Sequence, residues 1–334
     1  MRSIYKLIFC CFCFFILLVQ ACKEPSLEVH IKRFDTDLLK PANATNPSFY
    51  PQLAQSYLGF YDSYCIDLLG IDSSERSVYF APSLKGFIAY PGIQMLKHEV
   101  DSVFPNLDFL EADLGKAMYR YQKEFPESKV PSFVAFISEF GYAHVTYDSI
   151  IGIGLDMYLG SNYPIYKAPS IEFPDFMVNK LRKEYILPNT LKAIGIGRFE
   201  PTLSDKRFIA MMLFEGKLRY FVKQLAPQLA DTLLFGYSKS QLDWCKQNEG
   251  MVWKHLSETN LLFSTEVAQY MRYLNDGPFT IATGVPQESA PAMAVYTGYR
   301  VIEAFVKKTD MSLQELMEFK DWDKILRESG YRPN

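Results

Sequence analysis

The 334-residue sequence lacks most of the signatures by which an enzyme can be recognised from its chain. It contains only four His residues, and no two stand one helical turn apart in the His-Glu-x-x-His pattern of zinc proteases. It has no Gly-x-Ser-x-Gly or Ser-x-x-Lys nucleophile motif. Its Gly-x-Gly pairs do not occupy a strand-to-helix turn. The sequence therefore predicts no metal and no cofactor, and favours a protein that is not an enzyme.

Cysteine is scarce once the start of the chain is set aside. Of the six Cys, three fall within the first 13 residues and a fourth is Cys22. The other two, Cys65 and Cys245, occupy apolar positions of helical patterns. A disulfide between them is one reading, but this placement favours two separate buried thiols. There is no Cys-x-x-Cys pair and hence no zinc-finger spacing.

Strong charge bias is also absent, since the formal net charge is only −3 and no long basic run occurs. This argues against nucleic acid as a partner. Aromatic residues, in contrast, make up 15 % of the chain, which is ample material for a globular core. After residue 21, no stretch reaches the roughly 18 consecutive apolar residues that would predict a membrane-spanning helix.

The first residues have the order of a bacterial lipoprotein signal peptide. Arg2 and Lys6 precede an apolar run, Leu7–Val19, which is too short to span a bilayer, and Ala21 precedes Cys22. We expect residues 1–21 to be removed and Cys22 to carry diacylglycerol and palmitate. The protein would then face the periplasm, attached to the inner or the outer membrane. The alternative is an ordinary signal peptide or short anchor that happens to contain a Cys.

The remaining chain is predicted to form a leading segment, residues 22–46, and one α+β domain, residues 47–334. A short strand is expected at 28–34, and three strands at 132–138, 143–147 and 150–155 form a small antiparallel meander with the last strand central. Residues 73–93 are a poorly patterned connection. The body is predominantly helical. The helices are expected at 48–70, 106–125, 174–185, 188–196, 204–225, 238–259, 265–274, 291–307, 313–319 and 322–328.

One helix raises a chemical question. Residues 207–221 follow a possible N-cap, Ser204, and their apolar positions recur at helical spacing as one stripe with Met211 and Met212 in it. Glu215 falls in that stripe, where a carboxylate is costly unless it is paired or hydrogen-bonded. Glu215 is therefore either an acid satisfied by an Arg or by backbone, or the carboxylate of a functional site.

Two further carboxylates are candidates to act with Glu215. Asp156 follows a strand of buried type, and Asp276 lies in the segment Asn275–Thr280. If the three met in space, they could share a proton or hold a cation. The structural alternative is a turn or N-cap role for Asp156 and an Asx-turn for Asp276. A spacing of roughly 5–10 Å in one open cleft would support a two-carboxylate hydrolase.

A set of short motifs, spread over the whole mature chain, gives a further indication. They are residues 31–35 (IKRFD), 153–160 (IGLDMYLG), 215–221 (EGKLRYF), 276–280 (DGPFT), 298–302 (GYRVI) and 329–333 (SGYRP), with Asn248, Glu249 and Trp253. Taken in the order in which they occur along the chain, these motifs resemble those of the GldB-type gliding motility lipoproteins of Bacteroidetes.

The resemblance implies a zincin-like fold related to predicted zinc-dependent proteases, with residues 207–221 in the place of the active-site helix. Phe214 and Leu218 stand where the two zinc-binding His would be. It also implies a role in gliding motility and type IX protein secretion.

The prediction is a non-catalytic envelope lipoprotein that binds other gliding or secretion proteins through a degenerate protease cleft. A carboxylate-dependent or metal-dependent hydrolase, and a purely structural anchor with an acidic surface, are the alternatives. The candidate cleft or binding residues are Asp156, Tyr158, Glu215, Trp253, Asp276 and Tyr299.

Overall fold

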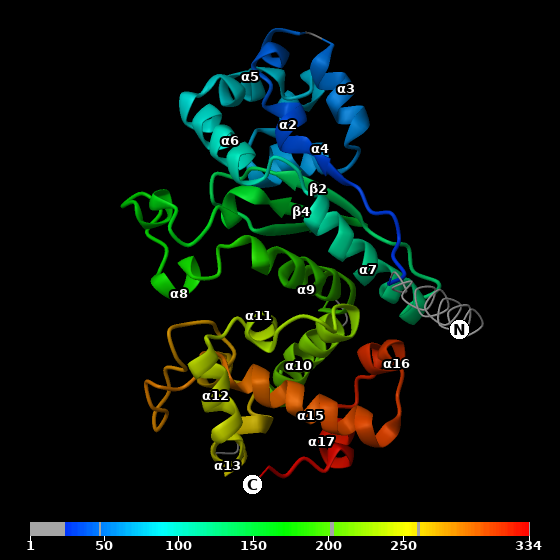
Figure 1. Ribbon diagram of the computed structural model, residues 1–334, viewed down its shortest axis with the longest axis vertical. Helices are drawn as coiled ribbons and strands as arrows, with labels where there is room; N and C mark the ends of the chain where they lie inside the picture. The colour runs from blue at the N-terminus through cyan, green and yellow to red at the C-terminus, as the bar shows by residue number, and fades with distance from the viewer. Residues whose placement is uncertain (1–23, 47, 201–203, 259–260, 334) are drawn as a thin grey trace, which may run out of the picture.

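The structure, a computed structural model, describes residues 24–46, 48–200, 204–258 and 261–333 (Figure 1). A small sheet lies in the upper half of the molecule, with the N-terminal helices above it and the longer C-terminal helical body below. The predicted α+β class is confirmed. Cys65 and Cys245 are both buried and both free, as the sequence predicted.

The sheet is mixed, which differs from the predicted meander. Its strands are β1 (Ile31–Arg33), β2 (Ser132–Phe136), β3 (His144–Tyr147) and β4 (Ile150–Gly154), in the order β1-β2-β4-β3. β4 is interior, as predicted, but β1–β2 and β2–β4 are parallel pairs and only β3–β4 is antiparallel. β2 and β4 are apolar and almost wholly buried, which is typical of parallel strands covered on both faces.

Helices make up most of the remaining described chain. Those between β1 and β2 are α2 (Phe34–Leu38), α3 (Phe49–Ser56), α4 (Phe60–Ser63), α5 (Ala81–Ala89), α6 (Pro91–Val103) and α7 (Asp108–Glu124). Those after the sheet are α8 (Asp175–Val178), α9 (Ile186–Phe199), α10 (Phe208–Leu225), α11 (Asp231–Phe235), α12 (Lys239–Gln247), α13 (Glu249–Glu258), α14 (Val267–Tyr270), α15 (Met293–Thr309), α16 (Leu313–Glu318) and α17 (Trp322–Ser329).

Short tight turns connect several of these helices. The 3₁₀ segments are η1 (Pro41–Thr45), η3 (Ser73–Val78), η4 (Leu155–Tyr158), η5 (Pro164–Lys167), η6 (Lys183–Tyr185), η8 (Leu261–Phe263) and η9 (Met271–Tyr273), and one π-helical turn is η2 (Tyr64–Leu68). The expected long helices at 174–185, 238–259 and 265–274 are therefore each divided into two shorter pieces, α12 and α13 meeting at Asn248.

The prediction of an unpatterned connection at 73–93 was wrong, because this region holds η3, α5 and the start of α6. Pro82 and Pro91 lie in the first turn of α5 and α6. Proline is well tolerated there, since its missing N–H would have no helical partner in any case. The two prolines therefore begin helices within the region predicted to be a connection.

The start of α10 also differs from the prediction. Ser204 does not cap it; the helix begins at Phe208 after an extended Arg207. The carboxylate of Asp205 accepts hydrogen bonds from both the backbone N–H and the guanidinium of Arg207, and the N–H of Phe208 donates to the carbonyl of Ser264. The turn is thus fixed by side-chain and long-range contacts that helical periodicity does not reveal.

α10 is the central helix of the C-terminal body and crosses α15 at close range (Figure 1). At the crossing, a Cβ added to Gly216 would overlap the backbone of Gly298, and one added to Gly298 would overlap the carbonyl of Met212. Only a residue without a side chain allows the two backbones to approach so closely. These glycines fix the position of α10, which lines the site described next.

Candidate binding cleft

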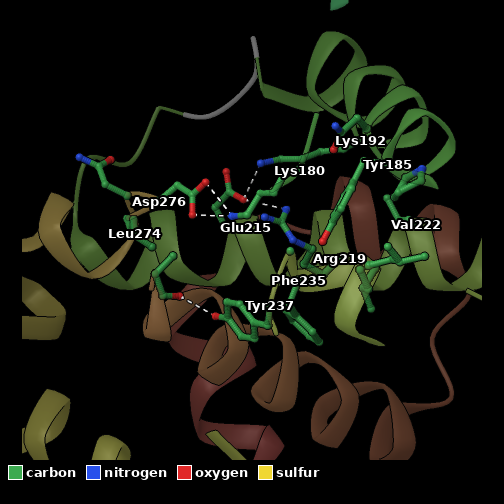
Figure 2. A pocket seen from close by; sticks show the side chains of 17 residues that line it. Lys180, Tyr185, Lys192, Glu215, Arg219, Val222, Phe235, Tyr237, Leu274 and Asp276 are labelled. Carbon is green, nitrogen blue, oxygen red and sulfur yellow. Dashed lines mark hydrogen bonds and ion pairs between the residues drawn. The ribbon is translucent and has the colours of Figure 1, made fainter. Parts of the chain in front are cut away.

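One face of α10 lines a cleft of about 300 Å³ (Figure 2). α9, α11, residues 236–237 and residues 274–276 supply the other walls. Glu215 lies on this half-buried face with Met211 and Arg219, and its side chain is 24 % exposed. The sequence placed Glu215 and Met211 inside the core stripe. They lie at the edge of the buried face, which extends around the helix to include Phe214, Lys217 and Phe221.

Two cations hold Glu215. Arg219 Nη1 donates to its carboxylate at 3.0 Å, and Lys192 Nζ from α9 lies 3.2 Å from the same oxygen. Burial alone would raise the pKa of Glu215, but the charges of Arg219 and Lys192 outweigh it and hold that pKa below its usual value. The pKa of Lys192 is itself lowered, by burial and by the neighbouring Arg219. Glu215 is therefore a paired carboxylate at neutral pH.

Asp276 lines the same cleft, so the structure brings together two of the three predicted carboxylates (Figure 2). Lys180 Nζ lies 2.6 and 2.7 Å from its two carboxylate oxygens. One of these oxygens also accepts the N–H of the next residue, Gly277, at 3.0 Å. This contact differs from the predicted Asx-turn, in which the N–H two residues on would donate. Both carboxylates of the cleft are thus matched by at least one cation.

A second cavity of about 340 Å³ adjoins the cleft and shares Lys180, Tyr185 and Tyr237 with it. It adds Arg182 to the lining. The Nε atoms of Arg182 and Arg219 are buried and have no hydrogen-bond partner among the described residues. The cations of the two cavities outnumber the carboxylates, so together they present a net positive surface.

Asp156 lies elsewhere, fully buried in η4. Its carboxylate accepts the N–H of Phe140 at 2.7 Å and the N–H of Ser138 at 3.1 Å. Burial raises the pKa of Asp156 to about 6, against the lowering effect of these hydrogen bonds. Asp156 therefore fixes the turn after β2, which agrees with the structural alternative, and it does not line the cleft.

The three aromatic candidates are Tyr158, Trp253 and Tyr299. None of them lines the cleft or the adjoining cavity. The hydroxyl of Tyr158 accepts from Asn189 at 3.0 Å and lies 3.3 Å from His144 Nδ1. Tyr299 packs edge-on against Phe235 at 5.2 Å. Trp253 packs edge-on against Tyr331 at 5.2 Å between ring centroids. These contacts are those of core and near-core side chains.

Sequence reasoning missed Lys217, which is fully buried on α10. Its ammonium donates to the carbonyl of Phe319 and lies 4.5 Å from the centroid of the Trp322 ring. Burial lowers the pKa of Lys217 to about 7. The signal was in the sequence, because Lys217 falls three residues after Phe214 and four before Phe221, on the face that packs inward.

Several motif residues from distant parts of the chain meet at the C-terminus. Glu249 accepts from Arg300 Nε at 3.0 Å and from the hydroxyl of Tyr331 at 2.7 Å. Trp253 packs on the ring of that same tyrosine. Arg300 follows Tyr299 on α15. The motifs at 248–253, 298–302 and 329–333 therefore form one cluster that holds the end of the chain.

Within the ranges that the structure describes, no group of three or more His, Cys, Asp or Glu side chains is arranged to hold a metal ion. In the comparisons with known proteins, the family model described as gliding motility protein GldB matches residues 19–333. No curated protein and no solved structure matches the chain.

Proposed function

The chain belongs to the GldB family of gliding motility lipoproteins, and we propose that it acts as a lipid-anchored binding protein of the cell envelope and carries out no reaction. The family supports a place in the envelope. The removal of residues 1–21, the lipid on Cys22 and the periplasmic orientation are parts of the proposal, because these residues lie outside the described ranges. Within those ranges, no helix is long and apolar enough to cross a membrane.

One observation supports binding over catalysis: each candidate carboxylate is already engaged by donors of the protein. Lys192 and Arg219 hold Glu215, Lys180 holds Asp276, and backbone N–H groups hold Asp156. A general acid or base needs a pKa near the working pH and access to the substrate. The pKa of Glu215 is moved the other way, and Asp156 is buried outside the cleft.

The proposed occupant of the cleft is a segment of another envelope protein of the gliding or type IX secretion apparatus. Three features of the cleft suit a polypeptide: concave walls, aromatic rings such as Phe235 and Tyr237, and charged groups at fixed positions. The excess of cations favours a segment that carries a carboxylate. The zincin-like relation stays a prediction and is not needed for this function.

In-cell crosslinking tests the proposal. The full-length protein, purified through an affinity tag with its Cys22 anchor, is compared with a Lys180→Glu variant, and the attached proteins are identified by mass spectrometry. We expect wild type to retain a gliding or secretion protein that the variant loses. An exposed-site variant, Lys239→Glu on α12, is the matched control and should retain that protein.

The hydrolase alternative makes the opposite prediction. Purified mature protein would hold stoichiometric zinc by elemental analysis, or would cleave peptides in a way that Glu215→Gln abolishes. Either result would overturn the proposed function. Retention of the same proteins by wild type and by Lys180→Glu would show that the cleft is not the binding site.

A further inference from the structure

A larger apolar groove, about 560 Å³, lies on another part of the molecule, between α6 and the segment 163–171. Its lining includes three large side chains that are strongly exposed: Met95 at 71 %, Tyr90 at 58 % and Ile165 at 41 %. Leu96, Phe140 and Tyr163 form the deeper walls. Exposed apolar side chains gathered in one concave surface mark an interaction site more often than scattered ones do.

One wall of the groove is a strained turn. Glu139 and Phe140 both have positive φ, at 53° and 67°, although neither is glycine. Such a conformation is strained for a residue with a side chain and persists only where the surroundings enforce it. The buried carboxylate of Asp156 does so, through the N–H groups of Ser138 and Phe140. Asp156 thereby holds the ring of Phe140 at the groove, against Tyr166 at 5.7 Å.

The groove also has a charge signature. Glu99 on α6 and Glu139 in the strained turn both line it and are both exposed. Neither forms an ion pair with any residue that the structure describes. This contrasts with the cleft at α10, where each carboxylate has a cation. Two unpaired carboxylates beside an apolar surface complement an apolar ligand that carries positive charge.

One wall of the groove, the segment 163–171, lies far from the first described residues of the chain. The first described residues run along α7, where the N–H of Leu27 bonds to the carbonyl of Gly115 and Glu24 pairs with Arg120. Figure 1 shows this end of the chain on the right, and the segment after β4 that forms the groove's outer wall on the left. An acyl chain of the anchoring membrane is therefore a poor occupant.

We propose that this groove binds an apolar segment of a partner protein that has Lys or Arg next to its apolar side chains. Glu99 and Glu139 pair with the basic residue, Met95 and Ile165 cover the apolar side chains, and Asp156 positions the turn. This site is separate from the cleft beside Glu215, so either proposal can fail without the other.

Site-specific photo-crosslinking tests it. A photo-crosslinking residue replaces Met95 in the full-length protein in its native cells, and the crosslinked peptide is sequenced by mass spectrometry. Met251, which is 61 % exposed on α13, is the matched control position. We expect an adduct at position 95 alone, with a partner peptide that is apolar and contains Lys or Arg. An adduct with a second copy of this chain, with lipid or with an acidic peptide would overturn the proposal, as would equal labelling at both positions.

Charge reversal supplies the second arm. In the crosslinking protein, Glu99→Lys with Glu139→Lys should reduce the adduct about fivefold or more, since each change replaces attraction to the basic residue of the ligand with repulsion. Glu288→Lys, at an exposed position outside the groove, should leave the adduct unchanged. The urea midpoint of each variant confirms that it is folded. Equal adduct yields from the Glu99→Lys/Glu139→Lys protein and the Glu288→Lys protein would contradict the charge part of the proposal.

Discussion

Lys217 and Glu215 lie two residues apart on α10 and meet opposite environments. Glu215 is at the edge of the helix's inner face and has two cations beside it. Lys217 is fully buried, with a carbonyl and an indole ring as its neighbours. Lys217 has no carboxylate partner among the described residues, so desolvation disfavours its charged form and its pKa falls to about 7.

Lys217 gives the fold a predictable dependence on pH. Its folded pKa lies below the unfolded value of 10.5, so the unfolded chain binds more protons between the two values. The stability contributed by neutral Lys217 is therefore complete above pH 10.5 and is lost as the pH falls through about 7. Urea unfolding should show wild type gaining stability from pH 7 to pH 9 relative to Lys217→Met. A constant difference between the two proteins over this range would contradict the assignment.

Titration of Asp156 should change the folding stability with pH in the opposite direction, in the acid range. Its folded pKa, about 6, lies above the unfolded value of 3.8, so its contribution is complete below pH 3.8 and is lost as the pH rises through about 6. Asp156→Asn removes this titration. The stability of wild type should fall relative to the variant between pH 4 and pH 7, as measured by urea unfolding. Parallel curves would show that Asp156 does not titrate in this window.

At the scale of elements, hydrophobic periodicity predicted the long helices. It did not predict features that depend on contacts between separate elements. The helices at 106–125, 204–225 and 291–307 appear as α7, α10 and α15 with small shifts at their ends. Strand pairing was not predictable from periodicity, because the parallel neighbour of β4 is β2, from which it is separated along the chain by β3. The cluster of charges in the cleft was also hidden, since Lys180, Lys192, Glu215 and Asp276 are brought together only by the packing of separate elements.

The crossing of α10 and α15 yields a matched pair of glycine variants. Gly298→Ala should cost about 3 kcal/mol of unfolding free energy, because its Cβ would overlap the backbone of Met212 and force the helices apart. Gly86→Ala, in α5 with open space around it, should stabilise by about 0.5–1 kcal/mol. Denaturant unfolding measures both. A Gly298→Ala protein as stable as wild type would show that the helices have room to separate.

At the scale of the whole molecule, the motifs that carry the family resemblance have mostly structural roles in this chain. Gly216 and Gly298 set a helix crossing, Glu249 and Tyr331 hold the C-terminus, and Asp156 fixes a turn. Of the six cleft candidates named from sequence, only Glu215 and Asp276 line the cleft. A motif identifies positions that the fold uses, but it does not separate a packing role from a binding role.

The central claim is that this lipoprotein works by binding, so its function should not depend on the acid–base chemistry of Glu215. The most direct measurement is the gliding speed of cells whose only copy carries Glu215→Gln, with protein abundance checked by immunoblot. The amide oxygen of Gln can still accept from Arg219, so we predict gliding close to wild type. Glu215→Lys places a third cation beside Lys192 and Arg219 and should stop gliding. Loss of gliding in Glu215→Gln cells that contain normal amounts of the folded protein would contradict the claim.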